Sequence, residues 1–547
     1  MSRYLLIASV IALCCAVPSL QAQDKFLAKN AGEWVSQLKT NLDAKQRRHA
    51  AFALGKLGSR AVPSLPEMKL AFAKEKDAKV REALVYAMGE ICRDSVGTNG
   101  DVDLERIFIS AANNQDTYVR RSGVFALGCL GNKSRESLQA LETALGDSEA
   151  IVRQNAAWAL GQFGEAALPM LKKALHDPDT LVKRDAAGAL LQMKDADKVH
   201  ELLKDILPLC RDKNSETCRA ALNVLVRIVE PKDREAIEPL CVPLKGRDLE
   251  NKRNAALALS NIGGEETAIA LPVLLEAFKN GDADLRKQAV LAIRGIGPSA
   301  ARVVPDLIAV LRDDKDAEIR GYAALALGGI GKASEPAIPL LVKKIQDAGE
   351  TTDTRIQCAM AMARIGNGAA AVAVVPDLIG VVGNPLHDAK VRERVIWALR
   401  VHGAELRNMN GVKEAFTRVV MEARTEQNRM LRYDSAYMLG MIWQQQAPEP
   451  TLDVLTEYLH DDSIKIFDKT VSGVGGASAE TKGGTTAVEE RGKGDGRIMA
   501  VDALKMMGPG RYAGRAPLMK QLRVLAADNT LYEPLRTKSI ELVRMAK

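Results

Sequence analysis

The feature that most constrains this chain is a short motif that recurs along almost its whole length. Each copy has an anchor residue, basic in all copies but one, that is followed by a helical pattern of apolar positions. Successive anchors lie 30 to 40 residues apart, except for one interval of 65 residues. Self-similarity at such a period is typical of proteins in which one small structural unit stacks on the next copy. The anchors are Arg47, Arg81, Arg120, Arg153, Lys183, Cys218, Lys252, Arg286, Arg320, Arg355, Arg392, Arg432, Arg497 and Arg536.

The residues around each anchor predict an amphipathic helix. Position +6 from the anchor is Ala in eleven of the fourteen copies, and position −4 is Asp in eight. Positions −1, +3, +4, +6, +7 and +10 fall on one face at a helical angle of about 100° per residue. We expect the Asp at −4 to cap the helix. Glycines at +8 or just after +10 are expected to weaken and end it: Gly55, Gly58, Gly128, Gly131, Gly161 and Gly164.

A second helical segment precedes each anchor helix, and a proline often stands in its first turn, where the missing N–H costs little. These prolines are Pro169, Pro272, Pro305, Pro339, Pro376 and Pro517. A single helix pair cannot bury its apolar face alone, so the pairs must stack on one another. The sequence therefore predicts an all-α protein, an α-solenoid built as a superhelix of about fourteen helix pairs.

The motif resembles the HEAT-repeat family, in the short form of the PBS lyase (bilin-lyase-like) HEAT-like repeats. The resemblance rests on Asp-x-x-Val-Arg-x-x-Ala-x-x-Ala-Leu-Gly, which residues 77–89 and 116–128 follow with small departures, and extends over about 31–547. It implies an armadillo-like helical solenoid whose anchor helices line a concave surface. Some relatives are enzymes, either bilin lyases or hydroxylases that hold iron with several His-Glu pairs. This chain has one such pair, His200-Glu201, so we expect no enzymatic activity, cofactor or metal, with lyase- or hydroxylase-like activity as the alternative.

The N-terminus reads as a secretory signal. Arg3 supplies a positive start, residues 4–17 are apolar but too few to span a bilayer, and Leu20-Gln21-Ala22 resembles a cleavage site. We expect residues 1–22 to be a signal peptide, residues 23–547 to be the solenoid, and the protein to be exported to the periplasm or the extracellular space. The sequence shows no other stretch that is long and apolar enough to span a membrane.

The one long interval predicts an insertion within one repeat, at about 463–496. Residues 471–496 are rich in Gly, Ser, Thr and charge, which is typical of a flexible loop. Such a loop is either a tolerated insertion or a functional element. Cys210, Cys218 and Cys241 lie close enough in sequence to include one disulfide in an oxidising compartment.

Two rows of side chains on the anchor helix form the candidate binding site. Position +5 carries aromatic residues in several copies: Phe52, Tyr86, Phe125, Trp158, Trp397 and Tyr437. Position +1 carries basic residues: Arg48, Arg121, Arg184, Arg219, Arg253 and Lys287. Such rows suit an acidic peptide, an anionic glycan or a helix of a partner. The alternative is ordinary packing between neighbouring repeats.

The sequence therefore favours a non-catalytic, exported scaffold that binds a protein partner along its concave surface. The alternative is binding of an anionic polysaccharide or envelope polymer. The formal charge of +7 is spread along the chain and gives no reason to expect nucleic acid as a partner.

Two further patterns have structural interpretations. The anchor Arg or Lys is expected to pair with the Asp at −4 of its own or a neighbouring repeat, because a buried cation needs a partner. His176, His387 and His460 each stand in Leu-His-Asp at the end of a first helix. That recurrence indicates turn chemistry rather than a metal site, since these histidines belong to different repeats and do not converge.

Overall fold

The structure is a computed structural model that describes residues 25–93, 95, 101–466 and 494–547. The expected signal peptide, residues 1–22, and most of the expected insertion, residues 467–493, lie outside the described residues. The chain divides into two compact units, Met1–Ile228 and Val229–Lys547, here called the N-terminal and C-terminal units.

The N-terminal unit begins with a two-residue antiparallel ladder that pairs β1 (Lys25–Phe26) with β2 (Lys29–Asn30). Helices follow to the end of this unit. They are α2 (Ala31–Thr40), α3 (Ala44–Leu57), α4 (Leu65–Lys74), α5 (Ala78–Arg93), α6 (Val102–Ala112), α7 (Thr117–Leu130), α8 (Arg135–Ala144), α9 (Ala150–Leu160), α10 (Leu168–Leu175), α11 (Thr180–Leu190), α12 (Ala196–His200), α13 (Leu203–Ile206) and α14 (Ser215–Ile228).

The C-terminal unit repeats the same alternation and contains one further ladder, between β3 (Lys465–Ile466) and β4 (Gly494–Asp495). Its helices are α15 (Ile237–Lys245), α16 (Leu249–Ile262), α17 (Leu271–Asn280), α18 (Ala283–Ile296), α19 (Val304–Asp313), α20 (Ala317–Ile330), α21 (Ile338–Gln346), α22 (Thr352–Ile365), α23 (Ala369–Ala373), α24 (Val375–Gly383), α25 (Ala389–Leu399), α26 (Gly403–Leu406), α27 (Val412–Val420), α28 (Arg429–Trp443), α29 (Glu449–His460), α31 (Ile498–Met507), α32 (Pro509–Tyr512), α33 (Ala516–Ala527) and α34 (Glu533–Met545).

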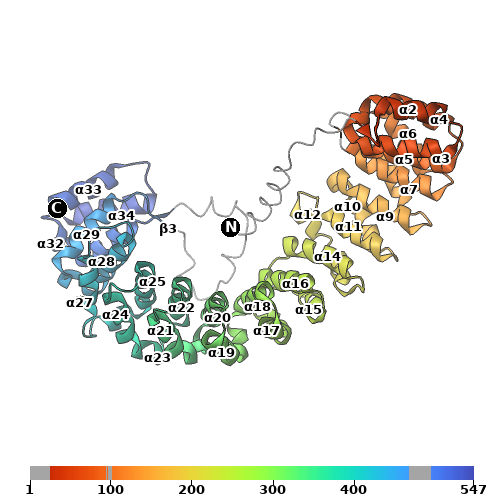
Figure 1. Ribbon diagram of the computed structural model, residues 1–547. Coiled ribbons are helices and arrows are strands. Elements are labelled where there is room, and N and C mark those ends of the chain that lie inside the picture. The colour runs from red at the N-terminus through yellow and green to blue at the C-terminus, as the bar shows by residue number, and fades with distance from the viewer. Residues whose placement is uncertain (1–24, 94, 96–100, 467–493) are drawn as a thin grey trace. The chain divides into compact units, whose positions relative to one another are not determined.

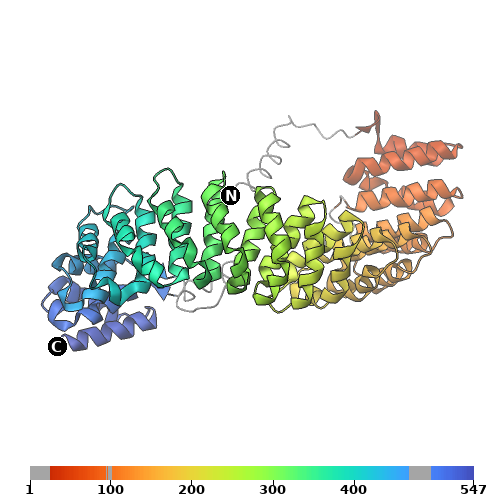
Figure 2. The ribbon, with the colours of Figure 1, turned by 90° about the horizontal axis from the view of Figure 1, so that it is seen from below.

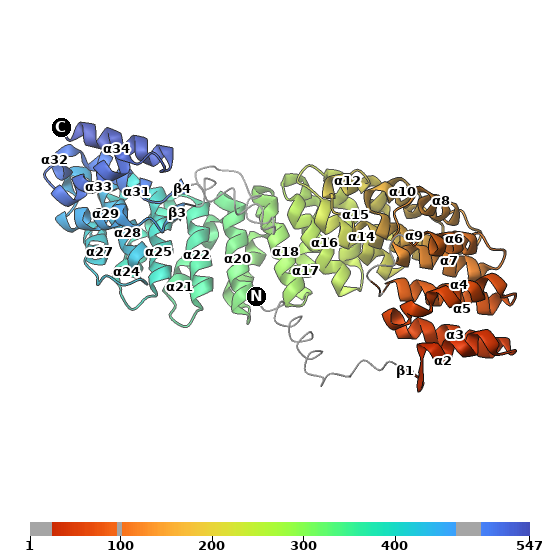
Figure 3. The same cartoon turned by 90° about the horizontal axis from the view of Figure 1, so that it is seen from above.

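The all-α prediction and the number of repeats are confirmed for the part of the chain that the structure describes. Each anchor lies on, or directly before, the second helix of a pair, from Arg47 on α3 to Arg536 on α34. In Figure 1 the second helices α16, α18, α20, α22 and α25 form one row of the C-terminal unit, and the first helices α15, α17, α19, α21 and α24 form the other. Seen from below and from above, successive helices of a row run side by side (Figures 2 and 3).

The helix ends follow from the predicted capping residues. All eight Asp side chains at −4 accept a backbone N–H from the first turn of the second helix, as Asp116 does from Tyr118 and Val119. All six singled-out prolines stand at the first or second position of a first helix. Short 3-10 segments such as Gly58–Ser64 lead into several of these first helices. The local sequence therefore sets where the helices begin.

Two of the three predicted glycines at +8 require a correction, whereas the third, Gly161, ends α9 as expected. Gly58 and Gly131 do end their helices with a positive φ, as expected, but Gly55 and Gly128 lie inside α3 and α7 and end nothing. A Cβ at Gly55 would lie 2.9 Å from the Cα of Ala87, which is the +6 alanine of the next repeat. Glycine is needed there because neighbouring second helices approach too closely for any side chain. The +8 glycine and the +6 alanine thus fit against each other from one repeat to the next.

The two ends of the long interval between repeats are hydrogen-bonded to each other. Lys465 pairs with Asp495 and Ile466 with Gly494, and the N–H of Gly496 donates to the carbonyl of Ile464 at 2.9 Å. The ends of the expected insertion, residues 463–466 and 494–496, are therefore fastened to each other before the chain enters α31.

The cysteines outside the first 24 residues are free thiols, so no disulfide links Cys210, Cys218 and Cys241. The Cys218 thiol instead donates to the carbonyl of Cys210 at 3.4 Å. Across the described residues, every helix is too short or too polar to cross a lipid bilayer.

Candidate binding face on the second helices

The anchor arginines form ion pairs between neighbouring repeats, as predicted, but with a different acid. This series of ion pairs is here called the ladder. Arg120 binds Asp147 at 2.7 Å and Arg153 binds Asp177 at 2.8 Å, and each acid stands at −6, not −4, of the next repeat. The −4 carboxylates are already used as helix caps, which explains why they are not the acceptors. Arg120 also donates to the carbonyls of Asn114 and Gln115 in its own loop. Each anchor therefore ties its own loop to the loop of the following repeat.

The same arrangement recurs wherever the −6 acid, or an acid close to it in the loop, is present. The further pairs are Arg47–Glu75, Lys183–Asp212, Arg286–Asp314, Arg320–Glu350 and Arg392–Glu422. For Arg81 the residue at that position of the next repeat is Asn114, which is not an acid. Arg81 instead lies over the ring of Phe72, 4.1 Å from its centroid. Because these cations are half-buried and paired, the anchor column holds the repeats together and is not an open anion-binding stripe.

The electrostatics of the ladder favour the ionised acids. Burial alone would raise the pKa of Glu350, but hydrogen bonds from Arg320 and Lys344 outweigh it and hold the pKa at about 2. Burial likewise opposes ionisation of Asp147, and the hydrogen bond from Arg120 lowers its pKa below the usual value. Hydrogen bonds to the ionised carboxylates explain why the pKa values of Glu350 and Asp147 are both lowered.

The aromatic row of the N-terminal unit is a continuous stack on the second-helix face. The rings of Tyr86 and Phe125 lie 5.0 Å apart with 17° between their planes, and those of Phe125 and Trp158 lie 5.4 Å apart with 18°. All three side chains are half-buried. Phe52 is 44% exposed and makes an edge contact with Phe26. Packing and exposure therefore coexist, because the rings cover one another while part of each still faces solvent.

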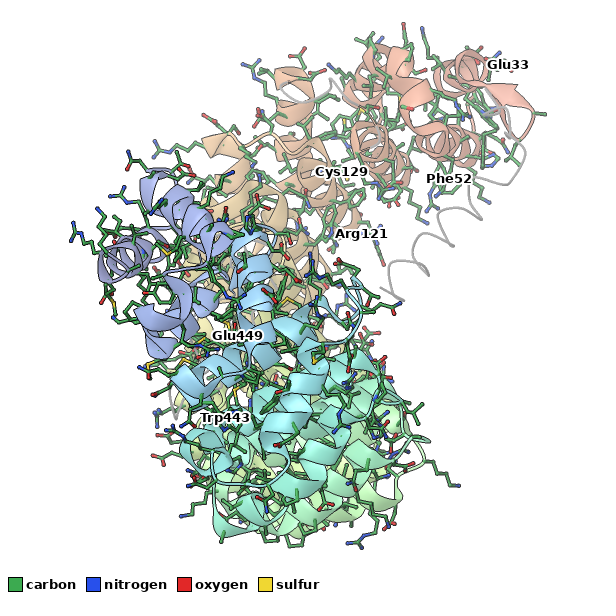
Figure 4. All side chains as sticks on the ribbon, turned by 90° about the vertical axis from the view of Figure 1, so that its left-hand side faces the viewer. Glu33, Phe52, Arg121, Cys129, Trp443 and Glu449 are labelled. Carbon is green, nitrogen blue, oxygen red and sulfur yellow. The ribbon has the colours of Figure 1, made fainter. Side chains whose placement is uncertain are left out.

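Figure 4 shows where part of this face lies on the N-terminal unit. Phe52 of α3 and Arg121 and Cys129 of α7 are on one side of the helices, whereas Glu33 of α2 is on the other. First and second helices of the unit thus present different faces, and the predicted residues belong to the second-helix face.

The two remaining predicted aromatics belong to the C-terminal unit and do not continue a stack. Trp397 and Tyr437 are both half-buried on α25 and α28. Arg400 lies over the Tyr437 ring, 4.7 Å from its centroid. The structure therefore brings Tyr86, Phe125 and Trp158 together and leaves Trp397 and Tyr437 as a separate group.

The basic row at +1 is engaged by acids on the neighbouring second helix. Arg121 binds Glu82 at 2.9 Å, and Arg48 approaches the same carboxylate at 4.0 Å. Arg184 binds Glu216 at 3.0 Å in the N-terminal unit, and Arg253 with Asp282 and Lys287 with Glu318 do the same in the C-terminal unit. Arg219 also has a partner. The face therefore carries exposed ion pairs instead of a row of uncompensated cations.

The recurring histidines make different contacts in the structure. His176 pairs with Asp205 at 2.8 Å, His387 bonds Arg355 at 2.7 Å, and His460 bonds the carbonyl of Thr456 at 2.8 Å. The contact of His460 is local and lies at a helix end, in agreement with the turn interpretation, whereas His176 and His387 contact residues of a neighbouring repeat. Within the described ranges, no three His, Cys, Asp or Glu side chains lie close enough to hold a metal ion.

One buried carboxyl group on this face was not singled out in the sequence. Asp434, on α28, is only 7% exposed and has no hydrogen bond or ion pair within the described part of the chain. Burial, followed by the negative charge of Glu393 on α25, raises the pKa of Asp434 to about 7. Asp434 stands at +2 from its anchor, a position that the sequence alone gives no reason to examine.

The family comparisons point to one family. The sequence profile described as HEAT repeats matches residues 105–191, 203–294, 271–351 and 304–400. The profile described as PBS lyase HEAT-like repeat matches residues 46–65. No curated protein is similar enough to the chain to count as a relative.

Known structures are similar to this chain at low sequence identity. One chain of a homology model of the full-length AP-3 complex has a TM-score of 0.61 at 12% identity, over 100% of this chain and 99% of that one. Importin beta has a TM-score of 0.45 at 15% identity, over 100% of this chain and 76% of its own. An engineered protein has a TM-score of 0.42 at 20% identity, over 68% of this chain and 98% of its own. The likeness to the AP-3 chain agrees with a helical solenoid.

Proposed function

Because the chain belongs to the family of HEAT-repeat proteins, we propose that it is a non-catalytic scaffold that binds a protein partner along its second-helix face. Solenoids of stacked repeats offer extended surfaces on which many modest contacts add up. The observation that carries the proposal is the half-exposed stack of Tyr86, Phe125 and Trp158. Large rings that are held rigid lose little entropy on binding, which is why aromatic residues dominate protein interfaces.

The charges beside the stack favour a protein over a polyanion. An anionic polymer needs a run of uncompensated cations, but Arg121 shares Glu82 with Arg48, and Arg184 is bound by Glu216. A protein segment carries both signs of charge and apolar side chains, so it can exchange contacts with exposed ion pairs at little cost. We include export in the proposal, on the strength of the signal-like residues 1–22.

The proposal is tested by placing a photo-crosslinking amino acid on each face of the N-terminal unit. Asn155 lies on α9 of the second-helix face, and Lys173 on the first helix α10 is the matched control, with a side chain that is 67% exposed. The crosslinker at Asn155, and not at Lys173, should capture one defined protein from the cell envelope. The captured protein is then purified, and its affinity is measured for the wild type and for the folded triple variant Tyr86→Ala, Phe125→Ala, Trp158→Ala.

Two outcomes would contradict the proposal. Equal crosslinking from both faces, or equal affinity for the triple variant, would mean that the stack does not bind the partner. Capture of a polysaccharide, with an affinity that collapses as salt rises, would support the polymer alternative instead.

A further inference from the structure

The aromatic stack ends abruptly at its C-terminal side. Tyr86, Phe125 and Trp158 occupy position +5 of three successive second helices, α5, α7 and α9. The next +5 residue is Gly188 on α11. A Cβ built at Gly188 would meet no other atom within 4 Å. Among the described residues, Phe125 is the one ring in contact with Trp158, and no cation lies over it.

The support for a fourth ring is nevertheless present. Two rings of the stack lie against the +8 glycine of the preceding helix: a Cβ at Gly89 would lie 3.5 Å from the Phe125 ring, and one at Gly128 would lie 2.7 Å from the Trp158 ring. Gly161, directly after α9, is the corresponding glycine, and a Cβ there would lie 3.2 Å from the Cδ of Gln192 instead of a ring. The flexible Gln192 side chain thus lies where the preceding repeats place a ring, and an incoming ring would displace it.

The polar groups around this position are satisfied by one another. Arg184 binds Asp185 at 2.7 Å and Glu216 at 3.0 Å, and Gln154 donates to Asp185 at 2.9 Å. Gln162 donates to Gln192 at 2.7 Å. Because Arg184 is held between two carboxylates, it is not free to stack on Trp158, and the position is left to a planar ring from outside the chain.

We propose that Trp158 and Gly188 form an open stacking position that receives one uncharged aromatic side chain of the protein partner. The inference rests on the proposed function, because it names the side chain by which that partner is anchored. The incoming ring stacks on the free face of Trp158 at the offset and near-parallel angle that the three resident rings already adopt. This anchor gives the scaffold a preference for segments that present a Phe, Tyr or Trp.

The position is tested first with small probes. The protein contains four tryptophans, so labelling with 5-fluorotryptophan gives few fluorine signals, and Trp158→Phe assigns the relevant one. N-acetyl-tyrosinamide should shift the Trp158 signal in a saturable way. N-acetyl-argininamide and N-acetyl-leucinamide, which are charged and non-planar comparators, should shift it far less. No saturable shift with the tyrosine probe, or a stronger one with the arginine probe, would overturn the proposal.

Two variants at one residue then locate the site. Gly188→Phe fills the position from within the chain and should weaken tyrosine-probe binding by about tenfold or more. Gly188→Ala adds one methyl group in open space, leaves the position free, and should keep the wild-type affinity. Equal affinity for all three proteins would overturn the assignment.

The same variants separate this inference from the scaffold proposal. A partner that crosslinks at Asn155 but binds Gly188→Phe as tightly as the wild type would refute the stacking position alone. Failure to capture any protein, with the probe still binding and still blocked by Gly188→Phe, would refute the scaffold proposal. The stacking position would then stand as a site for a free aromatic compound, and its assignment to a partner protein would be wrong.

Discussion

The carboxyl group of Asp434 should make the C-terminal unit less stable as pH rises from about 4 to about 7. Asp434 is buried on α28 and is faced by Glu393 and Arg394 of α25 and by Arg400 directly after it, while Tyr458 of α29 also lies near it. No hydrogen bond or ion pair compensates its charge within the described residues. The folded protein therefore holds a proton on Asp434 up to about pH 7.

The magnitude follows from the difference between the folded and unfolded pKa. An unfolded Asp titrates near 3.9, so the pKa rises by about 3 units, or about 4 kcal/mol at about 1.4 kcal/mol per unit. The stability is fully present below about pH 4, where both states are protonated. It is lost progressively as pH rises from about 4 to about 7, because over this range the unfolded state releases its proton while the folded state keeps it. Above about pH 7 both states have released the proton, so the stability stays low.

The perturbation is Asp434→Asn, which keeps the shape and removes the titration. Relative to the wild type, the variant should be about equally stable at pH 4 and more stable by up to about 4 kcal/mol at pH 8. Hydrogen exchange of peptides from α25 and α28 measures this locally, and comparison at the same pH cancels the intrinsic exchange rate. At pH 8 the variant's protection should be up to about a thousandfold higher. A difference that is the same at pH 4 and pH 8 would refute the reasoning.

The remaining predictions concern the packing and the ladder. Gly128→Ala should destabilise the N-terminal unit by about 1–3 kcal/mol in thermal unfolding, because its Cβ would lie 2.7 Å from the Trp158 ring; Gly188→Ala, in open space, should show no such loss. Asp147→Asn should lower the free energy of unfolding by about 1–3 kcal/mol, because Arg120 loses its carboxylate partner. A double-mutant cycle with Arg120→Met should show that part of this loss is interaction energy between the two side chains. The low pKa of Glu350 gives a stability contribution that is present above pH ~4.3 and lost as pH falls to about 2. The destabilisation caused by Glu350→Gln should therefore shrink over that range, and a constant difference would contradict it.

Much of the fold could be predicted because its determinants are local. The Asp at −4 and the proline of the first helix act within a few residues of where they stand in the sequence, and both were located correctly. The role of Gly55 and Gly128 was missed because it depends on an alanine one repeat away. The acid of the ladder was also misplaced, although acids at −6, such as Asp147, Asp177 and Asp314, form a column that the sequence displays.

The candidate site was predictable only in part. The pattern identified the row that contains Tyr86, Phe125 and Trp158, since position +5 is fixed by helical periodicity. It could not show that these rings stack while Trp397 and Tyr437 do not, because ring orientation depends on contacts between repeats. Nor could it show that the cations at +1 are engaged by acids such as Glu82, which lies on a different helix.

The most direct test of the account is the affinity of the protein captured through Asn155 for the triple variant Tyr86→Ala, Phe125→Ala, Trp158→Ala, compared with the wild type at the same salt concentration. Hydrogen exchange serves to check that both are folded. We expect the triple variant to lose about a hundredfold or more in affinity, since rigid aromatic anchors each contribute about 1–2 kcal/mol or more to an interface. An unchanged affinity in a folded variant would contradict it and would show that the aromatic stack serves packing alone.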